Sequence, residues 1–124
     1  MNMEGFQSWI ESYGRAWESH EPQIFADLFT DDASYYVNPF SEPLSGRSAL
    51  RDYWSNIVRS QEQTRFDYEV LAITQDIGIA HWWTSFVYIS SKTKVKLDGI
   101  FVISLNDESH CKVFKQWWHW LEYS

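Results

Sequence analysis

The sequence contains 124 residues, of which 19% are aromatic, and it carries a formal net charge of −7 at pH 7. This length suits a single domain spanning residues 1–124 with one hydrophobic core. The negative charge, with no run of Lys or Arg, argues against nucleic acid and anionic membranes as partners.

The amino-terminal segment has neither the basic start nor the apolar centre of a signal peptide. No stretch of the sequence approaches the ~18 apolar residues that a membrane-spanning helix requires. Cys111 is the only cysteine, so an intramolecular disulfide is impossible. We therefore expect a cytoplasmic protein.

The first third of the chain is expected to be helical. Apolar residues recur at helical spacing over residues 3–19 and form one stripe, which consists of Phe6, Trp9, Ile10, Tyr13, Ala16 and Trp17. Pro22 suits the first turn of a second, short helix, whose inner face would contain Ile24, Phe25, Leu28 and Phe29. Asp31 and Asp32 follow this helix and are expected to cap a turn.

The middle of the chain is expected to contain a strand at 34–40 that Pro39 breaks, then a loop at 41–46. A third helix follows, with Leu50, Tyr53, Trp54, Ile57 and Val58 on one face. The remaining apolar segments predict strands at 66–74, 79–89, 94–105 and 112–122. Because the turns between them are short, neighbouring strands should be antiparallel. The pattern predicts an α+β fold in which three helices cover one face of a curved sheet.

Two of the predicted strands have aromatic residues on both faces. Alternation places Trp82 and Phe86 on one face of strand 79–89 and Trp83 on the other, while Trp117 alternates with Trp118 in the last strand. A sheet with one face in water would show more polar residues on that face. We therefore expect the outer face to be covered by a second copy of the chain, with Trp83 and Trp117 buried in this homodimer.

Asp98 lies within one of the most hydrophobic runs of the chain, where residues 96–101 read KLDGIF. Alternation places its side chain on the same face as Ile100 and Val102. One interpretation is a solvated carboxylate near a strand end, paired with Lys96 or water. The other is an acid in an apolar pocket, where burial would raise its pKa and allow it to donate a hydrogen bond.

Several segments are similar, in order and spacing, to the nuclear transport factor 2-like superfamily. They are Tyr13, eighteen residues before Asp31, FTDDA at 29–33, NP at 38–39, SEPLSG at 41–46, LRDYW at 50–54 and LDGIF at 97–101. The SnoaL-like and ketosteroid-isomerase-like branches are the closest. The resemblance implies a cone-shaped, mainly antiparallel sheet that wraps the first helix and leaves an apolar pocket at its open end. It implies no single reaction, because this fold hosts several kinds of enzyme as well as binding proteins.

The resemblance to ketosteroid isomerases implies roles for two residues. Tyr13 corresponds to a first-helix tyrosine and Asp98 to a late-strand aspartic acid, and both would donate hydrogen bonds to a developing oxyanion. The position of the aspartate base falls on Val37 or Asn38, neither of which accepts a proton at neutral pH. We therefore expect steroid Δ5-to-Δ4 isomerisation to be absent or very slow.

The resulting hypothesis is a protein that binds a planar or polycyclic apolar ligand, and that acts on it as an isomerase or cyclase if it is an enzyme. Tyr13 and Asp98 would hold one ligand oxygen, and the predicted ligand-binding residues are Trp17, Asn38, Phe40, Trp54, Trp82, Phe86, Gln116, Trp118 and Trp120. A base would come from the substrate, from a water held by Asn38, or from His119.

The alternative is a non-catalytic dimeric binding or assembly domain whose pocket is vestigial. His81 and His119 could approach each other on neighbouring strands, on the dimer face. The four histidines show no metal-ligand spacing, so neither a metal nor another cofactor is expected.

Overall fold

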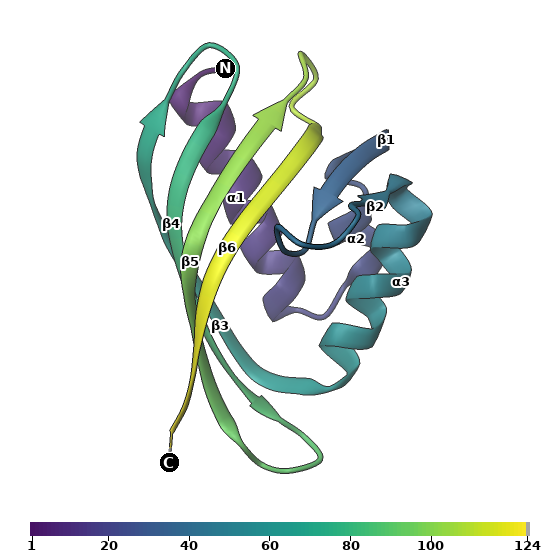
Figure 1. Cartoon of the computed structure of the whole chain (residues 1–124), viewed down its shortest axis with the longest axis vertical. Coiled ribbons are helices and arrows are strands. Elements are labelled where there is room, and N and C mark those ends of the chain that lie inside the picture. The colour runs from purple at the N-terminus through teal and green to yellow at the C-terminus, as the bar shows by residue number, and fades with distance from the viewer. Residues whose placement is uncertain (124) are drawn as a thin grey trace.

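The computed structural model describes residues 1–123 and combines three helices with a six-stranded sheet (Figure 1). The helices are α1 (Met3–Glu18), α2 (Pro22–Ala26) and α3 (Gly46–Arg59). The strands are β1 (Phe29–Tyr36), β2 (Leu44–Ser45), β3 (Gln61–Ile73), β4 (Gly78–Tyr88), β5 (Lys94–Leu105) and β6 (Cys111–Tyr123), in the sheet order β2-β1-β6-β5-β4-β3. Among the strand pairings within residues 1–123, only that of β1 with β6 is parallel. The predicted α+β fold with a curved, mainly antiparallel sheet is confirmed.

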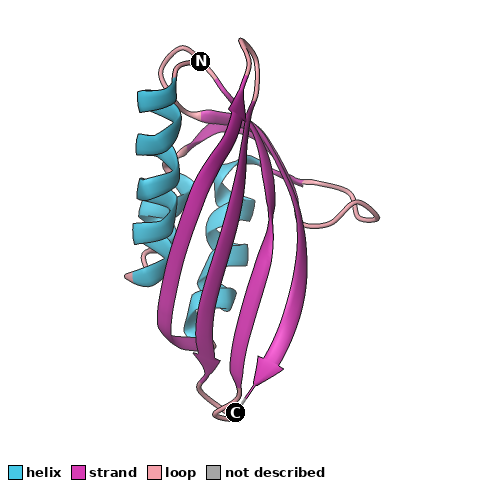
Figure 2. Cartoon of the chain, turned by 90° about the vertical axis from the view of Figure 1, so that its left-hand side faces the viewer, coloured by secondary structure: helices cyan, strands magenta, loops and turns pink. Residues whose placement is uncertain are grey.

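Helix α1 begins where Asn2 accepts a hydrogen bond from the backbone N–H of Gly5 at 2.7 Å. This cap satisfies one of the free amides at the helix start, and Glu4 in the first turn complements the helix dipole. The predicted apolar stripe is buried along the whole helix. All three helices lie on one side of the sheet, which leaves its other face open (Figure 2).

The core between the helices and the sheet is predominantly aromatic. The ring of Phe114 on β6 stacks on Tyr35 at a centroid distance of 4.4 Å and on Tyr13 at 5.5 Å. Strand β5 contributes Phe101 and Ile103, which are completely buried. Each buried side chain of this size stabilises the fold by roughly 2–3 kcal/mol through removal of apolar surface from water.

Strand β1 starts at Phe29, five residues earlier than predicted, and ends at Tyr36, before Asn38 and Pro39. The prediction that Asp31 and Asp32 cap a turn is therefore wrong, since both lie within the strand. The strand pairs with β6 at Phe29 and again from Ser34, with an irregular register between, so the two carboxylates remain exposed. Asp31 Oδ1 accepts a hydrogen bond from the guanidinium of Arg47 at 2.7 Å.

Two other features differ from the predictions, namely the start of β3 and the exposure of Ile24. Strand β3 begins at Gln61 rather than at residue 66. A register shift between Glu62 and Arg65 accommodates Gln63, whose φ is 56°. The polar segment before residue 66 therefore joins the strand, although its sequence shows no strand pattern. Ile24 is 48% exposed rather than on an inner face, because the five-residue helix α2 buries only Phe25 and Ala26.

Within residues 1–123, no helix has both the length and the hydropathy needed to cross a membrane.

Candidate functional site

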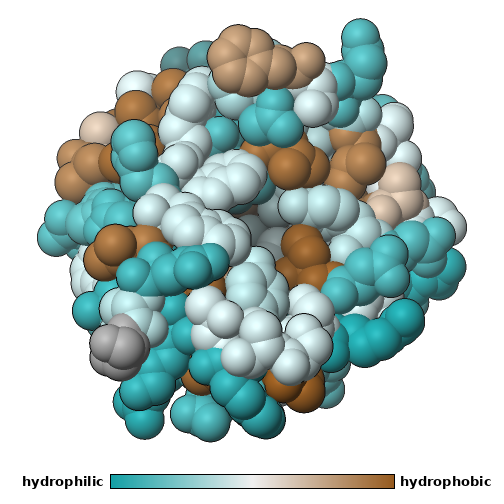
Figure 3. Space-filling view, turned by 60° about the horizontal axis from the view of Figure 1, so that its bottom comes forward, coloured by the Kyte–Doolittle hydropathy of each residue, from teal (hydrophilic) through white to brown (hydrophobic). Residues whose placement is uncertain are grey.

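A cavity of about 190 Å³ lies between helices α1 and α3 and the inner face of the sheet. Its lining includes Ile57 near the end of α3, Gln61 at the start of β3 and Tyr88 at the end of β4. It therefore lies towards the end of the molecule at which α3 leads into β3. The surface there is hollowed at its centre (Figure 3). We define this space as the inner cavity, and its lining is dominated by Trp, Tyr and Phe side chains.

A pair of tyrosine hydroxyls lies in the lining of the inner cavity. The hydroxyl oxygens of Tyr13 on α1 and Tyr35 on β1 are 3.3 Å apart, and both side chains are buried. Burial raises the pKa of both hydroxyls well above the ordinary value of 10 and that of Tyr53 to about 12. These groups are therefore neutral at physiological pH and can donate hydrogen bonds to a ligand.

Five other side chains with polar atoms line the inner cavity, and only some of these atoms have a hydrogen-bond partner. Trp17 Nε1 donates to Gln61 Oε1 at 2.9 Å, and Gln116 Nε2 donates to the carbonyl of Val37 at 3.4 Å. The indole N–H of Trp82 is buried without a partner among the described residues, whereas that of Trp54 is buried beside the Tyr35 hydroxyl without forming a well-aligned hydrogen bond. Buried donors without partners are uncommon, which makes these indoles candidates for contacts with a bound molecule.

The chemistry of the lining is neutral. Among the described residues around the inner cavity, none carries a carboxylate or an imidazole, and the titratable groups are tyrosines. A general base near pH 7 needs a group whose pKa lies close to that value. The lining therefore offers hydrogen-bond donors and apolar contact area, but no side chain suited to remove a proton from a ligand.

Asp98 lies on the outer face of the sheet, so the prediction that it shares a pocket with Tyr13 is wrong. Its carboxylate is 66% exposed and lies 2.9 Å from His81 Nε2. The reason is the direction of β5: Phe101 and Ile103 fill the core, and alternation then turns Asp98 outwards. Its expected partner Lys96 instead places its ammonium over the ring of Tyr123.

Asn38 and Phe40 also lie away from the inner cavity, contrary to their predicted place in the ligand pocket. Both belong to the loop after β1, where Asn38 Oδ1 accepts a hydrogen bond from the amide of Phe40 at 2.8 Å, and the Phe40 side chain is 97% exposed. Pro39 cannot continue the strand, so the chain turns away from the sheet here. Asn38 lines a separate hollow beside Trp117.

The other predicted ligand-binding residues do converge on the inner cavity. Tyr13 is joined there by Trp17, Trp54, Trp82, Phe86, Gln116, Trp118 and Trp120. Their roles in binding remain predictions. The lining also contains Tyr35, Tyr53, Gln61 and Tyr88, which were not among the predicted ligand-binding residues. Alternation within strand 34–40 could have indicated Tyr35, whereas Gln61 precedes the segment that shows a strand pattern.

His81 and His119 do not lie on neighbouring strands, because β5 separates β4 from β6. His81 instead bridges two carboxylates, with Nδ1 3.1 Å from Glu69 and Nε2 2.9 Å from Asp98. Burial lowers the pKa of His81, but the hydrogen bonds to the two carboxylates outweigh this effect and raise it above 6.5. Residues 1–123 contain no group of three or more His, Cys, Asp or Glu side chains that could hold a metal ion.

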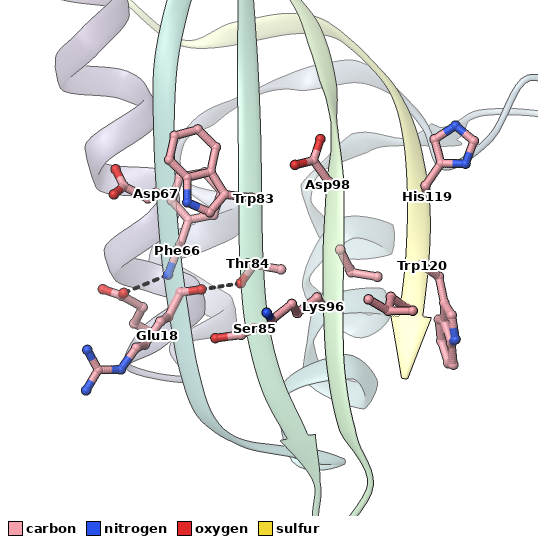
Figure 4. A pocket seen from close by; sticks show the side chains of 13 residues that line it. Glu18, Phe66, Asp67, Trp83, Thr84, Ser85, Lys96, Asp98, His119 and Trp120 are labelled. Atoms are coloured by element: carbon pink, nitrogen blue, oxygen red, sulfur yellow. Dashed lines mark hydrogen bonds between the residues drawn. The ribbon is translucent and has the colours of Figure 1, made fainter. Parts of the chain in front are cut away.

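A larger hollow of about 700 Å³ lies along the outer face of the sheet, where Trp83, Asp98 and His119 project from three adjacent strands (Figure 4). Charged side chains, including Asp67 and Lys96, also line it. It differs from the inner cavity in its position, and its lining reaches Glu18 of α1 beside strand β3.

Comparisons with known proteins identify the fold family. Residues 10–112 match the SnoaL-like domain family, whereas no curated protein sequence matches the chain. Among solved structures, the epoxide hydrolase/cyclase-like enzyme SalBIII, described for pyran ring formation in the polyether salinomycin, has a TM-score of 0.82 at 16% identity and covers 94% of this chain and 95% of its own.

Two further solved structures show the same fold. RV0760c from Mycobacterium tuberculosis has a TM-score of 0.84 at 11% identity, with 99% of each chain covered. A computationally designed 17-OHP binder has a TM-score of 0.80 at 13% identity and covers 95% of this chain and 96% of its own.

Proposed function

The chain belongs to the SnoaL-like domain family, within the nuclear transport factor 2-like superfamily, and from this premise we propose that its inner cavity binds a small, uncharged molecule. The observation that carries the proposal is the buried, unpartnered indole N–H of Trp82 in the lining of an aromatic cavity, together with the poorly satisfied indole N–H of Trp54 beside Tyr35. Donors that lack a good acceptor favour a ligand that supplies an acceptor oxygen.

The expected ligand carries a carbonyl or ether oxygen and no charge. The hydroxyls of Tyr13 and Tyr35 add further donor capacity next to the indoles. An anionic ligand would lose its hydration in an aromatic lining that offers no cation to compensate for it. A cationic ligand would lack a carboxylate partner, so a neutral molecule fits best.

The size of the inner cavity limits the ligand. Its volume of about 190 Å³ is below the roughly 300–1,000 Å³ typical of pockets for drug-sized molecules. A molecule with one or two rings fits this volume better than a four-ring skeleton. Trp120, which is 50% exposed, could swing outwards at the rim and admit a longer molecule.

We favour binding without proton abstraction over an isomerase or cyclase reaction. Ring closure of the kind named for SalBIII requires one group to release a proton and another to receive one. Neutral tyrosines could donate a hydrogen bond to an oxygen atom, but the lining provides no carboxylate or imidazole as a base. The non-catalytic alternative is therefore the better supported function.

A ligand titration followed by tryptophan fluorescence tests this proposal. The probe is 1-tetralone, a neutral two-ring ketone, and 1-naphthoate serves as an anion of similar shape. We expect 1-tetralone to bind more tightly than 1-naphthoate, and Tyr35→Phe to weaken its binding roughly five- to tenfold.

Adjacent tryptophans provide a matched control for that titration. Trp82→Phe removes an indole of the inner cavity, whereas Trp83→Phe removes one from the outer face. Only Trp82→Phe should weaken binding. Equal loss in both variants, tighter binding of 1-naphthoate, or no binding of 1-tetralone would contradict the proposal. Native mass spectrometry of the purified protein would then search for a bound molecule of another class.

The proposal also includes association of two copies through the outer face of the sheet. Trp83 and Trp117 are 36% and 46% exposed on this face, which no helix covers (Figure 2). Large exposed indoles on an open sheet are typical of an interaction surface. Sedimentation velocity at about 50 µM should therefore show a dimer, and a monomer would contradict this part of the proposal.

A further inference from the structure

Strand β3 contains a β-bulge beside the inner cavity. Glu62 pairs with Val87 and Arg65 with Ser85, so three steps along β3 lie opposite two steps along β4. The bulge includes Gln63, whose φ of 56° is in the left-handed region that glycine adopts more readily than other residues. Bulges are over-represented next to functional sites, where they re-aim a side chain.

The side chain that this bulge re-aims is that of Gln61. Gln61 and Phe66 are five residues apart, so strict alternation would place them on opposite faces of the sheet. The extra residue of the bulge brings both to the inner face. There Phe66 packs against Tyr13 at a centroid distance of 5.7 Å, and Gln61, which is 5% exposed, lines the inner cavity. A polar side chain is thus directed into an aromatic lining.

The hydrogen bond from Trp17 fixes the orientation of the Gln61 amide. Trp17 Nε1 can only donate, so the atom 2.9 Å away from it is the carbonyl oxygen Oε1 of Gln61. The nitrogen Nε2 belongs to the other arm of the amide and forms no hydrogen bond with a residue in the described part of the chain. The Gln61 amide therefore has N–H donors left for a molecule in the inner cavity.

These donors lie apart from the tyrosine hydroxyls of the same cavity. Tyr35 is on β1 and Gln61 on β3, and three strands separate β1 from β3 in the sheet. Trp17, the partner of Gln61, follows Tyr13 by about one turn of α1, and their ring centroids are 6.3 Å apart. The lining therefore has two groups of donors, one at Tyr13 and Tyr35 and the other at Gln61.

We propose that Gln61 determines specificity for a neutral ligand with acceptor oxygens at both ends, such as a diketone. The tyrosine hydroxyls bind one oxygen and the Gln61 amide binds the other. This inference rests on the proposed binding of an uncharged molecule and names its class. A ligand with a single oxygen would leave the amide N–H groups without water and without a partner, which lowers its affinity.

Two ligands of similar shape test the second oxygen. 1,4-Diacetylbenzene has a carbonyl group at each end of one ring, whereas 4-isopropylacetophenone has an isopropyl group in place of one acetyl group. Burial of apolar area alone would favour the isopropyl compound. We expect 1,4-diacetylbenzene to bind the unmodified chain roughly three- to tenfold more tightly instead. Isothermal titration calorimetry measures both dissociation constants.

Gln61→Glu separates donation to the ligand from the hydrogen bond with Trp17. A carboxylate still accepts from Trp17 Nε1 but has no hydrogen to donate, so the preference for 1,4-diacetylbenzene should disappear at about pH 9. Burial raises the pKa of the introduced carboxyl group, and its protonated form can donate again, so the preference should return at about pH 5. The titratable groups of the lining are tyrosines, whose pKa values are raised above 10, so they stay neutral at both pH values.

Gln63→Glu is the matched control, because it adds the same charge two residues away on an exposed side chain. This variant should keep the preference for 1,4-diacetylbenzene at both pH values. The ratio of the two dissociation constants is the readout, since it cancels changes in the cavity that affect both ligands. Circular dichroism verifies that each variant is folded.

The outcomes separate the role of Gln61 from the proposed binding itself. A preference that persists in Gln61→Glu at about pH 9 would overturn the role of Gln61. Equal or tighter binding of 4-isopropylacetophenone by the unmodified chain would also overturn it, whether or not the variant folds. Binding of an uncharged molecule would stand in both cases. If neither compound nor 1-tetralone bound to the unmodified chain, both proposals would be wrong.

Discussion

The imidazole Nε2 of His81 lies 2.9 Å from Asp98 Oδ1, while its Nδ1 lies 3.1 Å from Glu69 Oε1. The carboxylate of Asp98, which was predicted to lie in a pocket, is thus one end of a hydrogen-bond network of three residues across strands β3, β4 and β5. Both carboxylates are largely exposed, at 60% for Glu69 and 66% for Asp98, whereas the His81 side chain is 28% exposed. This geometry favours the imidazolium form of His81.

The first prediction concerns the pH dependence of the stability that this network of Glu69, His81 and Asp98 provides. The pKa of His81 is raised in the folded state above its ordinary value of 6.5, so its contribution to stability is fully present below pH 6.5 and is lost as pH rises through the folded-state pKa. Asp98→Asn should therefore reduce the unfolding free energy at pH 5.5 by about 0.5 kcal/mol, after allowance for solvent screening. The difference should vanish near pH 9.

Urea unfolding at the two pH values checks this expectation, and an NMR titration reports the pKa of His81 directly. Asp98→Asn should lower that pKa. Asp76→Asn, in the turn before β4, provides a control that leaves the pair intact. An equal loss of stability at both pH values would contradict the proposed role of the imidazolium.

The second prediction concerns the hydroxyl pair of Tyr13 and Tyr35. Replacing either residue by Phe leaves the other hydroxyl buried without this partner, so each single change should cost about 1–2 kcal/mol of unfolding free energy. Replacing both removes the pair together, so the double variant should lose less than the sum of the two single losses. Chemical denaturation of all four proteins gives this coupling, and strictly additive losses would show that the hydroxyls do not interact.

The third prediction concerns Cys111, which is completely buried. Burial raises the pKa of its thiol well above the ordinary value, so the reactive thiolate is scarce at neutral pH. Iodoacetamide should label the native protein far more slowly than the urea-unfolded protein at the same pH. Mass spectrometry measures the modified fraction over time, and rapid labelling of the native chain would indicate that β6 opens near Cys111.

Local patterns in the sequence were sufficient for the helices and for the faces of individual strands. The apolar stripe of α1 follows from spacing alone, and β5 was predicted with its observed bounds, Lys94–Leu105. Both the stripe of α1 and the bounds of β5 depend on residues close together in the sequence. Their predictions were accurate because hydrophobic periodicity reports directly on which side of an element is buried.

The position of Asp98 depends on information that no single strand contains. Alternation divides β5 into two faces, but both include apolar residues, with Phe101 on one and Ile100 on the other. Which face meets the helices is decided by the register of β5 with β4 and β6, which places Asp98 beside Trp83 and His119. The resemblance to ketosteroid isomerases suggested the opposite assignment, whereas the aromatic pattern had already placed Trp83 outside.

The inner cavity was predictable in its composition but not in its polar contacts. The tryptophans that line it were identified from alternation and resemblance together. The hydrogen bond between Trp17 and Gln61 was not predicted, because Gln61 is 44 residues away in the sequence. It belongs to a polar segment that becomes a strand only through pairing with β4. Long-range pairing of this kind leaves little trace in local periodicity.

The last prediction concerns Gly99, the neighbour of Asp98 in KLDGIF. A β-carbon at this position would overlap the backbone carbonyl oxygen of Trp117 and come within 2.9 Å of Trp118 Cβ. Because the first of these atoms belongs to the backbone of β6, it cannot move without disturbing the strand pairing. Gly99→Ala should therefore lower the unfolding free energy by about 3 kcal/mol.

Gly5→Ala provides the matched control for this change. Its β-carbon would lie 3.1 Å from the side-chain oxygen of Asn2, which can adjust, and alanine favours the helical conformation of α1. The unfolding free energy should change by no more than about 0.5 kcal/mol in this variant. Thermal and urea unfolding of both variants would test the comparison. Equal stability of the two would show that β5 and β6 can separate at Gly99, and that the close approach of these strands does not fix the direction of Asp98.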